Sequence, residues 1–130
     1  MFVDTSVVVA ILSGEQDADE WSNRIEQAPS RMTSALVVLE AAMRLSTKLS
    51  VEPLVAETVI GAFLHEANIE IVPIGAGEAS LAVKAFSDYG KGRGHPAQLN
   101  LADCLSYACA KSHGMPLLYN GNDFSRTDLA

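Results

Sequence analysis

The sequence predicts an α/β layer fold with a mainly parallel central sheet. Short apolar segments of strand length alternate with longer segments whose apolar residues recur at helical spacing. This alternation is typical of parallel strands that are connected by helices. Two of the apolar segments are followed closely by acidic residues, Asp4 and Asp123. Those positions lie at the sheet edge where ligands bind in such folds.

The size and composition predict a single domain over residues 1–130. Hydrophobic residues make up 48% of the chain, enough to bury a proper core. No apolar run approaches the roughly 18 residues of a membrane span, and Asp4 interrupts an N-terminal stretch that lacks a basic region. We therefore expect a cytoplasmic protein with no membrane partner. The net charge of −7 argues against a general basic surface for nucleic acid, but an acidic metal-binding nuclease remains compatible with it.

The first elements are a strand and two helices. Residues 1–3 are apolar and predict a short buried strand, after which Thr5 or Ser6 can cap a helix at residues 7–12. Residues 17–27 predict a second helix, because its acidic first turn suits the positive end of a helix dipole.

A second strand and two longer helices follow. Residues 31–33 predict a short strand, and Thr33 or Ser34 can cap a helix that runs to about Leu49. The helix at residues 53–67 begins with a proline, which is favoured in the first turn.

The second half continues the alternation. Residues 69–74 alternate like a strand, residues 75–77 predict a turn, and residues 78–89 predict a helix. The remaining expected elements are a glycine-rich loop at residues 90–98, a helix from an Asn100 cap to Ser112, a strand at residues 117–119 and a turn at Asn120-Gly121.

Four acidic residues are the candidates for chemistry, although each has an ordinary structural explanation. Asp4 can cap the helix that follows it. Glu40 interrupts the apolar run SALVVLEAAM, where it can pair with Arg44 at the edge of the helix face. Asp103 lies in the first turn of a helix, which favours an acid, and Asp123 follows a turn.

One geometry accounts for all four acids together. Two acids after strands and two on helices can converge at one edge of the sheet. Oxygen-only ligands suit Mg²⁺ or Mn²⁺ rather than zinc. Such a site can polarise a phosphoryl oxygen and supply a metal-activated water as nucleophile. Without the metal, mutual repulsion should raise the pKa of at least one of these carboxyl groups.

Three blocks in order carry a family resemblance: FVDTSVVVAIL, TSALVVLEAAMR and LNLADCLSYACAKSHGMPLLYNGNDFSRTDL. At these residues the chain resembles a PIN-domain protein, specifically a VapC-type toxin ribonuclease of bacterial type II toxin–antitoxin systems. The resemblance covers nearly the whole chain. It implies a three-layer PIN-like fold and a metal-dependent endoribonuclease that leaves a 5′-phosphate and a 3′-hydroxyl. It also implies a homodimer and a VapB-type antitoxin that occupies the active-site groove.

The resemblance assigns roles to particular residues of this chain. Asp4, Glu40 and Asp103 would bind Mg²⁺, directly or through water, with Mn²⁺ as a plausible substitute. Asp123 would be the fourth catalytic acid, and Ser6 would lie beside the site.

Three further residues, in two places, bear on the nuclease hypothesis. Close relatives often carry an acidic pair before the phenylalanine, whereas this chain has the uncharged Asn122 as the first member, which weakens the case for a second metal ion. The glycine-rich loop carries Lys91 and Arg93, which can offer cations to RNA phosphates or can belong to a solvated connector.

Two other classes of function compete with the nuclease hypothesis. A receiver-like domain would use a strand-end aspartate as phosphoacceptor, but it normally has an acidic pair near its first strand and a lysine after its last, and both are missing here. A catalytically weak PIN-type module that binds RNA or protein would not need an intact set of acids.

Overall fold

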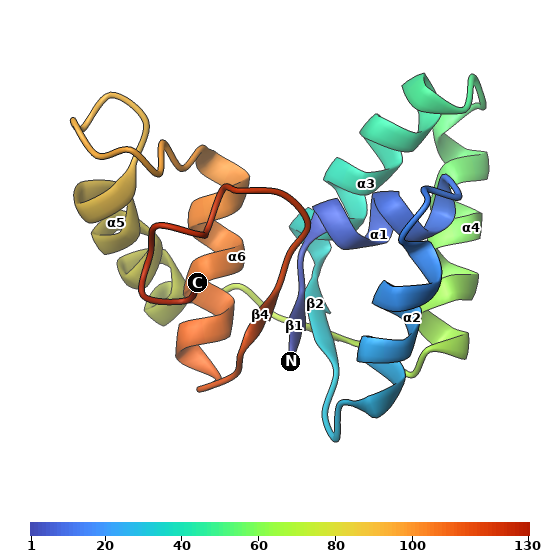
Figure 1. The fold of residues 1–130 in the computed structure, drawn as a ribbon, viewed down its shortest axis with the longest axis horizontal. Helices are drawn as coiled ribbons and strands as arrows, with labels where there is room; N and C mark the ends of the chain where they lie inside the picture. The colour runs from blue at the N-terminus through green and yellow to red at the C-terminus, as the bar shows by residue number, and fades with distance from the viewer.

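The computed structural model covers residues 1–130 and shows a four-stranded sheet with helices on both sides (Figure 1). The strands are β1 (Phe2–Val3), β2 (Met32–Ser34), β3 (Glu70–Val72) and β4 (Leu117–Leu118). The helices are α1 (Thr5–Leu12), α2 (Ala18–Gln27), α3 (Ala35–Lys48), α4 (Pro53–Glu66), α5 (Ala76–Tyr89) and α6 (Leu101–Ser112). The strand order is β3-β2-β1-β4 and every pairing is parallel, so the predicted α/β fold is confirmed.

The helices form two layers around the sheet. Helices α5 and α6 lie on one side, and α1 to α4 lie on the other (Figure 1). Helix α6 packs against β1, β2 and β4, while α3 contacts β2 and also reaches α6. The contact between α3 and α6 brings the two helix layers together beside the sheet. None of the helices has the length and apolar character needed to cross a membrane.

The central strand β1 fixes the position of the candidate site. Phe2 is fully buried and is paired with Met32 on one side and Leu117 on the other. The ladder continues past the strand, since the backbone N–H of Asp4 donates to the carbonyl of Leu118 at 3.0 Å. Because all strands are parallel, the chain leaves β1, β2 and β4 at the same edge of the sheet.

Helix α1 starts earlier than the sequence pattern predicts. Its N-cap is Asp4, neither Thr5 nor Ser6, and the Asp4 carboxylate accepts a hydrogen bond from the backbone N–H of Ser6 at 3.1 Å. Serine and aspartate are both good caps, so the pattern alone could not separate the three candidates.

The turn expected at residues 75–77 is also shorter than predicted. Gly75 caps α5, and its backbone N–H donates to the Glu78 carboxylate at 2.8 Å, so the helix starts at Ala76. Strand β3 ends at Val72, ahead of its expected end at residue 74. The physical reason is Pro73, which has no N–H to continue the ladder.

Candidate active site

Asp4 is held in a fixed position at the carboxyl end of β1. Its side chain is only 6% exposed and its Oδ2 atom accepts two hydrogen bonds from Ser6, from the backbone N–H at 3.1 Å and from the hydroxyl at 2.7 Å. The Ser6 hydroxyl in turn accepts from the backbone N–H of Asn120 at 2.9 Å. Ser6 therefore joins the end of β1 to the segment that follows β4, and it orients the Asp4 carboxylate.

Asp103 is the second buried acid, and it lies in the first turn of α6. Its side chain is 8% exposed. Asn100 and Asp103 form a capping box: Asn100 Oδ1 accepts from the backbone N–H of Asp103 at 2.9 Å, and Asp103 Oδ2 accepts from that of Asn100 at 3.1 Å. This pair satisfies two N–H groups at the start of the helix and fixes the direction of the carboxylate.

The electrostatics of Asp103 show that the four acids share one neighbourhood. The pKa of Asp103 is raised to about 7, and burial is the largest cause, against the opposing effect of the Asn100 hydrogen bond. The negative charges of Asp123, Asp4 and Glu40 contribute smaller parts of this rise. Asp4 after β1, Glu40 on α3 and Asp123 after β4 thus lie close enough to Asp103 for their charges to act on it, although burial contributes more to the raised pKa than this repulsion does.

Glu40 and Asp123 are less constrained than the two buried acids. Glu40 is partly buried on α3 and forms no salt bridge, so the alternative that it pairs with Arg44 is wrong. Asp123 is exposed and lies between the end of β4 and the fully buried Phe124. Neither of these two carboxylates is held by a hydrogen bond or an ion pair.

The donor chemistry of the four acids fits a hard divalent cation. All four offer only oxygen atoms, the ligands that Mg²⁺ and Mn²⁺ prefer. No three His, Cys, Asp or Glu side chains already surround a common point closely enough to hold an ion. At the same edge, Thr5 Oγ1 is buried without a hydrogen-bond partner in the protein. A cation that binds here would therefore have to draw in the less constrained carboxylates or be bridged by water.

The other predicted site residues lie on the surface. Asn122 is exposed, and its backbone carbonyl accepts hydrogen bonds from the backbone N–H and the hydroxyl of Ser125. Lys91 and Arg93 are exposed in the loop that leads from α5 to the cap of α6, and neither forms a salt bridge. The Arg93 guanidinium lies 5.8 Å from the centre of the Phe86 ring.

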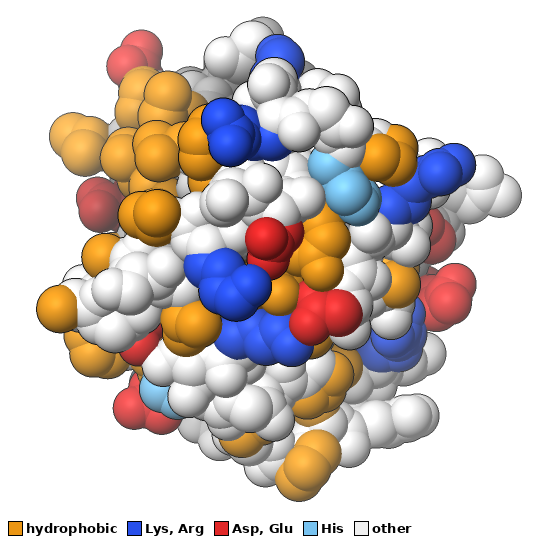
Figure 2. Space-filling model, turned by 90° about the vertical axis from the view of Figure 1, so that its left-hand side faces the viewer, with side chains coloured by type: hydrophobic (Ala, Val, Ile, Leu, Met, Phe, Trp, Pro, Cys, Tyr) orange, Lys and Arg blue, Asp and Glu red, His pale blue; other side chains and the backbone are white.

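Figure 2 shows the α5 side of the molecule, where Lys and Arg side chains are interspersed with acidic ones. The cations of this side are therefore spread among carboxylates rather than gathered into one basic patch.

Sequence reasoning missed the contact between Ser6 and Asn120. The two residues are 114 positions apart, and the acceptor is a side chain while the donor is a backbone N–H. No periodicity or motif reports a backbone donor of this kind. Only the parallel pairing of β1 with β4 brings it beside Ser6.

The fold agrees with the comparisons to known proteins. The PIN domain family matches residues 1–129. The toxin VapC20 of Mycobacterium tuberculosis, whose structure is described as that of a sarcin–ricin loop cleaving toxin, superposes with a TM-score of 0.76 at 19% identity, covering 99% of this chain and 95% of that one. A toxin–antitoxin complex from Klebsiella pneumoniae gives a TM-score of 0.71 at 19% identity, covering 98% and 92%. The chain belongs to the PIN-domain family.

Closer relatives narrow this assignment to one group of PIN proteins. Ribonuclease VapC42 of Mycobacterium tuberculosis is 40% identical over 131 residues, which span 99% of this chain and 96% of the relative. Ribonuclease VapC30 of the same species is 41% identical over 130 residues, spanning 100% and 96%. Within the PIN family the chain is a member of the VapC ribonucleases. This membership excludes the receiver-like alternative.

Proposed function

We propose that this chain is an Mg²⁺-dependent endoribonuclease and the toxin of a VapBC-type toxin–antitoxin system. The observation that carries the proposal is the shared neighbourhood of the four acids. Two of them, Asp4 and Asp103, are buried at the sheet edge, and the pKa of Asp103 is raised to about 7. Buried carboxylates that lie close together destabilise the fold when no cation is bound. Ionisable groups with such perturbed pKa values cluster at functional sites, and here they indicate a cation-binding site.

The proposed mechanism assigns a task to each of these side chains. Asp4, Asp103 and Glu40 would hold the ion, with Mn²⁺ able to replace Mg²⁺, and Asp123 would complete the acidic pocket. A cation held by these carboxylates would supply Lewis-acid stabilisation of the phosphate and would lower the pKa of a water nucleophile. Ser6 would keep the Asp4 carboxylate in place, since both of its hydrogen bonds to Oδ2 are already made. Cleavage would leave a 5′-phosphate and a 3′-hydroxyl.

The proposed partners are RNA, a VapB-type antitoxin and a second copy of the chain. An apolar groove of about 600 Å³ lies between α5 and α6, and Leu101, beside the Asp103 end of α6, is 78% exposed on it. Exposed apolar grooves of this kind commonly mark protein interaction sites. The similar Klebsiella pneumoniae structure is that of a toxin–antitoxin complex. We place the encounter with RNA and antitoxin in the cytoplasm, and residues 1–130 act as a single domain.

The decisive experiment compares RNA cleavage by the purified protein under three conditions. We expect cleavage with Mg²⁺, none with EDTA, and recovery when Mg²⁺ or Mn²⁺ is added in excess. Cleavage that continues undiminished in EDTA would contradict the metal mechanism. RNA that binds but is never cleaved in Mg²⁺ would instead favour the catalytically weak PIN-type module.

The exposed cations of the loop before α6 give a separate prediction about RNA binding. Replacing Lys91 and Arg93 together by alanine should weaken RNA affinity. The slope of log Kd against the logarithm of the salt concentration should fall by an amount that corresponds to at most about two phosphate contacts. Fluorescence anisotropy with single-stranded RNA at several salt concentrations measures both quantities. Lys84→Ala is the matched control, because Lys84 is already paired with Asp88 at 2.8 Å. An unchanged salt slope in the double variant would remove the loop from the RNA-binding surface.

A further inference from the structure

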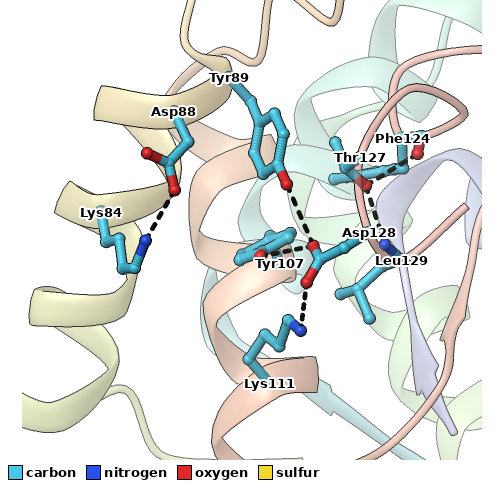
Figure 3. Close-up of polar contacts among 9 residues, drawn as sticks. All are labelled: Lys84, Asp88, Tyr89, Tyr107, Lys111, Phe124, Thr127, Asp128 and Leu129. Carbon is cyan, nitrogen blue, oxygen red and sulfur yellow. Dashed lines mark hydrogen bonds and ion pairs between the residues drawn. The ribbon is translucent and has the colours of Figure 1, made fainter.

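One carboxylate, that of Asp128, ties the C-terminal tail (residues 123–130) to α5 and α6. Asp128 Oδ1 accepts a hydrogen bond from the Tyr107 hydroxyl at 2.7 Å and a weaker one from the Tyr89 hydroxyl at 3.4 Å. Its other oxygen, Oδ2, pairs with the Lys111 ammonium at 2.5 Å. Figure 3 shows the Asp128 carboxylate between these three side chains. One residue of the tail thus contacts two helices.

The helix face that receives Asp128 also carries the buried acid of the site. Asp103, Tyr107 and Lys111 follow one another at four-residue spacing, so they lie along one face of α6. The rise of a helix places Tyr107 about 6 Å and Lys111 about 12 Å along the axis from Asp103. The charge of Asp123 is felt at Asp103, at the start of this face, and Asp128 is bound further along it. From Asp123 to Asp128 the tail therefore runs along α6 in the same direction as the helix.

The segment between Asp123 and Asp128 is held by one buried aromatic ring and by hydrogen bonds within the segment itself. Phe124 is fully buried, and its ring meets that of Tyr119 edge-on at 5.2 Å. The Thr127 hydroxyl donates to the carbonyl of Phe124 at 2.8 Å and accepts from the backbone N–H of Leu129 at 3.2 Å. Figure 3 shows this short, internally bonded turn next to Asp128. This hydrogen-bonded turn links the backbone of Asp123 to that of the anchored Asp128.

The Asp128 carboxylate is stabilised in its charged form. Burial opposes its ionisation, but the hydrogen bonds from Lys111 and Tyr107 outweigh that effect and lower its pKa. Burial and the bond to Asp128 raise the pKa of Tyr107, which keeps its hydroxyl protonated as a donor. The Asp128 carboxylate is therefore charged, and the Tyr107 hydroxyl is protonated to donate to it, throughout the neutral pH range.

We propose that Asp128 is a positioning residue, which holds the tail against α6 and thereby sets Asp123 opposite Asp103 for binding of the divalent cation. This inference rests on the proposed metal site. Asp128 does not touch the ion, and its effect passes through Phe124 to the neighbouring Asp123. Exposed Asp123 has no hydrogen bond of its own to hold its side chain, so its placement depends on the backbone that carries it.

The test measures metal binding rather than activity. Mn²⁺ is titrated into the purified full-length protein, and free Mn²⁺ is followed by electron paramagnetic resonance. Asp128→Ala should weaken Mn²⁺ affinity by about tenfold, the scale seen when the groups that orient metal ligands are removed. Asp128→Glu, which restores the carboxylate, should recover most of it.

The matched control is Asp88→Asn. It also removes one negative charge and breaks one aspartate–lysine pair, between Asp88 and Lys84, on a helix that carries none of the four acids. It should leave Mn²⁺ affinity unchanged. Circular dichroism must show that each variant is folded. Tyr107→Phe is a second and milder test, because it removes only the hydroxyl that donates to Asp128 and leaves the Lys111 ion pair.

Two results would overturn the proposal in distinguishable ways. If the unsubstituted protein binds Mn²⁺ and the folded Asp128→Ala and Tyr107→Phe variants bind it equally well, Asp128 has no positioning role. If the unsubstituted protein binds no Mn²⁺, the proposed metal site is itself wrong and this inference is lost with it.

Discussion

Asp4→Asn is expected to lower the rate of RNA cleavage by about a thousandfold while leaving the fold intact. The amide has nearly the shape of the carboxylate, and its oxygen can still accept the hydrogen bonds of Ser6 that cap α1. What is lost is the negative charge at the end of the central strand. The change therefore separates the charge of Asp4 from its structural role. Single-turnover cleavage of a labelled RNA in Mg²⁺ measures the loss.

The control for Asp4→Asn is a variant that loses one negative charge outside the set of four acids. Asp88→Asn has the same chemistry on the exposed surface of α5 and should cleave RNA at the unsubstituted rate. Thermal unfolding in EDTA should give similar Tm values for Asp4→Asn and the unsubstituted protein. Full cleavage by Asp4→Asn, in a preparation free of contaminating nuclease, would exclude Asp4 as a metal ligand.

Asp4 and Asp103 show why residue-by-residue reasoning left the site open. For each, the sequence offered a choice between a structural role at a helix start and a role in metal binding. The structure shows that the structural roles are real: Asp4 caps α1 and Asp103 closes the capping box with Asn100. These bonds do not compete with a site at the sheet edge, because they fix the direction of each carboxylate. A helix cap can therefore be part of the orientation of a candidate ligand.

The alternation of strands and helices predicted the sheet because it depends on local patterns. Pairing between distant parts of the chain was not predictable in the same way. The bond from Asn120 to Ser6 and the contacts of Asp128 with Tyr107 and Lys111 join segments whose proximity follows only from packing. The last residues of the chain have no helical or strand periodicity, so their position in the fold could not be predicted from the sequence. Their role depends on the face of α6 that they cover.

Asp103→Asn is expected to change activity and metal-free stability in opposite directions. Cleavage should fall as for Asp4→Asn, because a charged candidate ligand is removed. Stability should rise at pH 8 in EDTA, because the buried carboxylate no longer has to ionise beside Asp123, Asp4 and Glu40. The rise of the Asp103 pKa from 3.8 to about 7 corresponds to at most about 4 kcal/mol. The Asn100 hydrogen bond can be kept by the amide oxygen.

The sign of the pH dependence makes this prediction specific. Between pH 4 and 7 the folded protein holds a proton on Asp103 that the unfolded chain has released, so the free energy of unfolding falls as pH rises across this range. The contribution is constant above pH 7. Urea unfolding in EDTA at pH 4, 6 and 8 should therefore show a stability difference in favour of Asp103→Asn that grows with pH.

Added Mg²⁺ should reverse that difference, because a ligand that binds only the folded unsubstituted protein stabilises it by mass action. Asp88→Asn, a loss of charge on the surface, should show neither the gain in EDTA nor the loss of response to Mg²⁺. Suppose instead that Asp103→Asn is less stable than the unsubstituted protein at pH 8 without metal. The Asp103 carboxylate would then be a stabilising cap, and the electrostatic cost that supports the metal site would not exist.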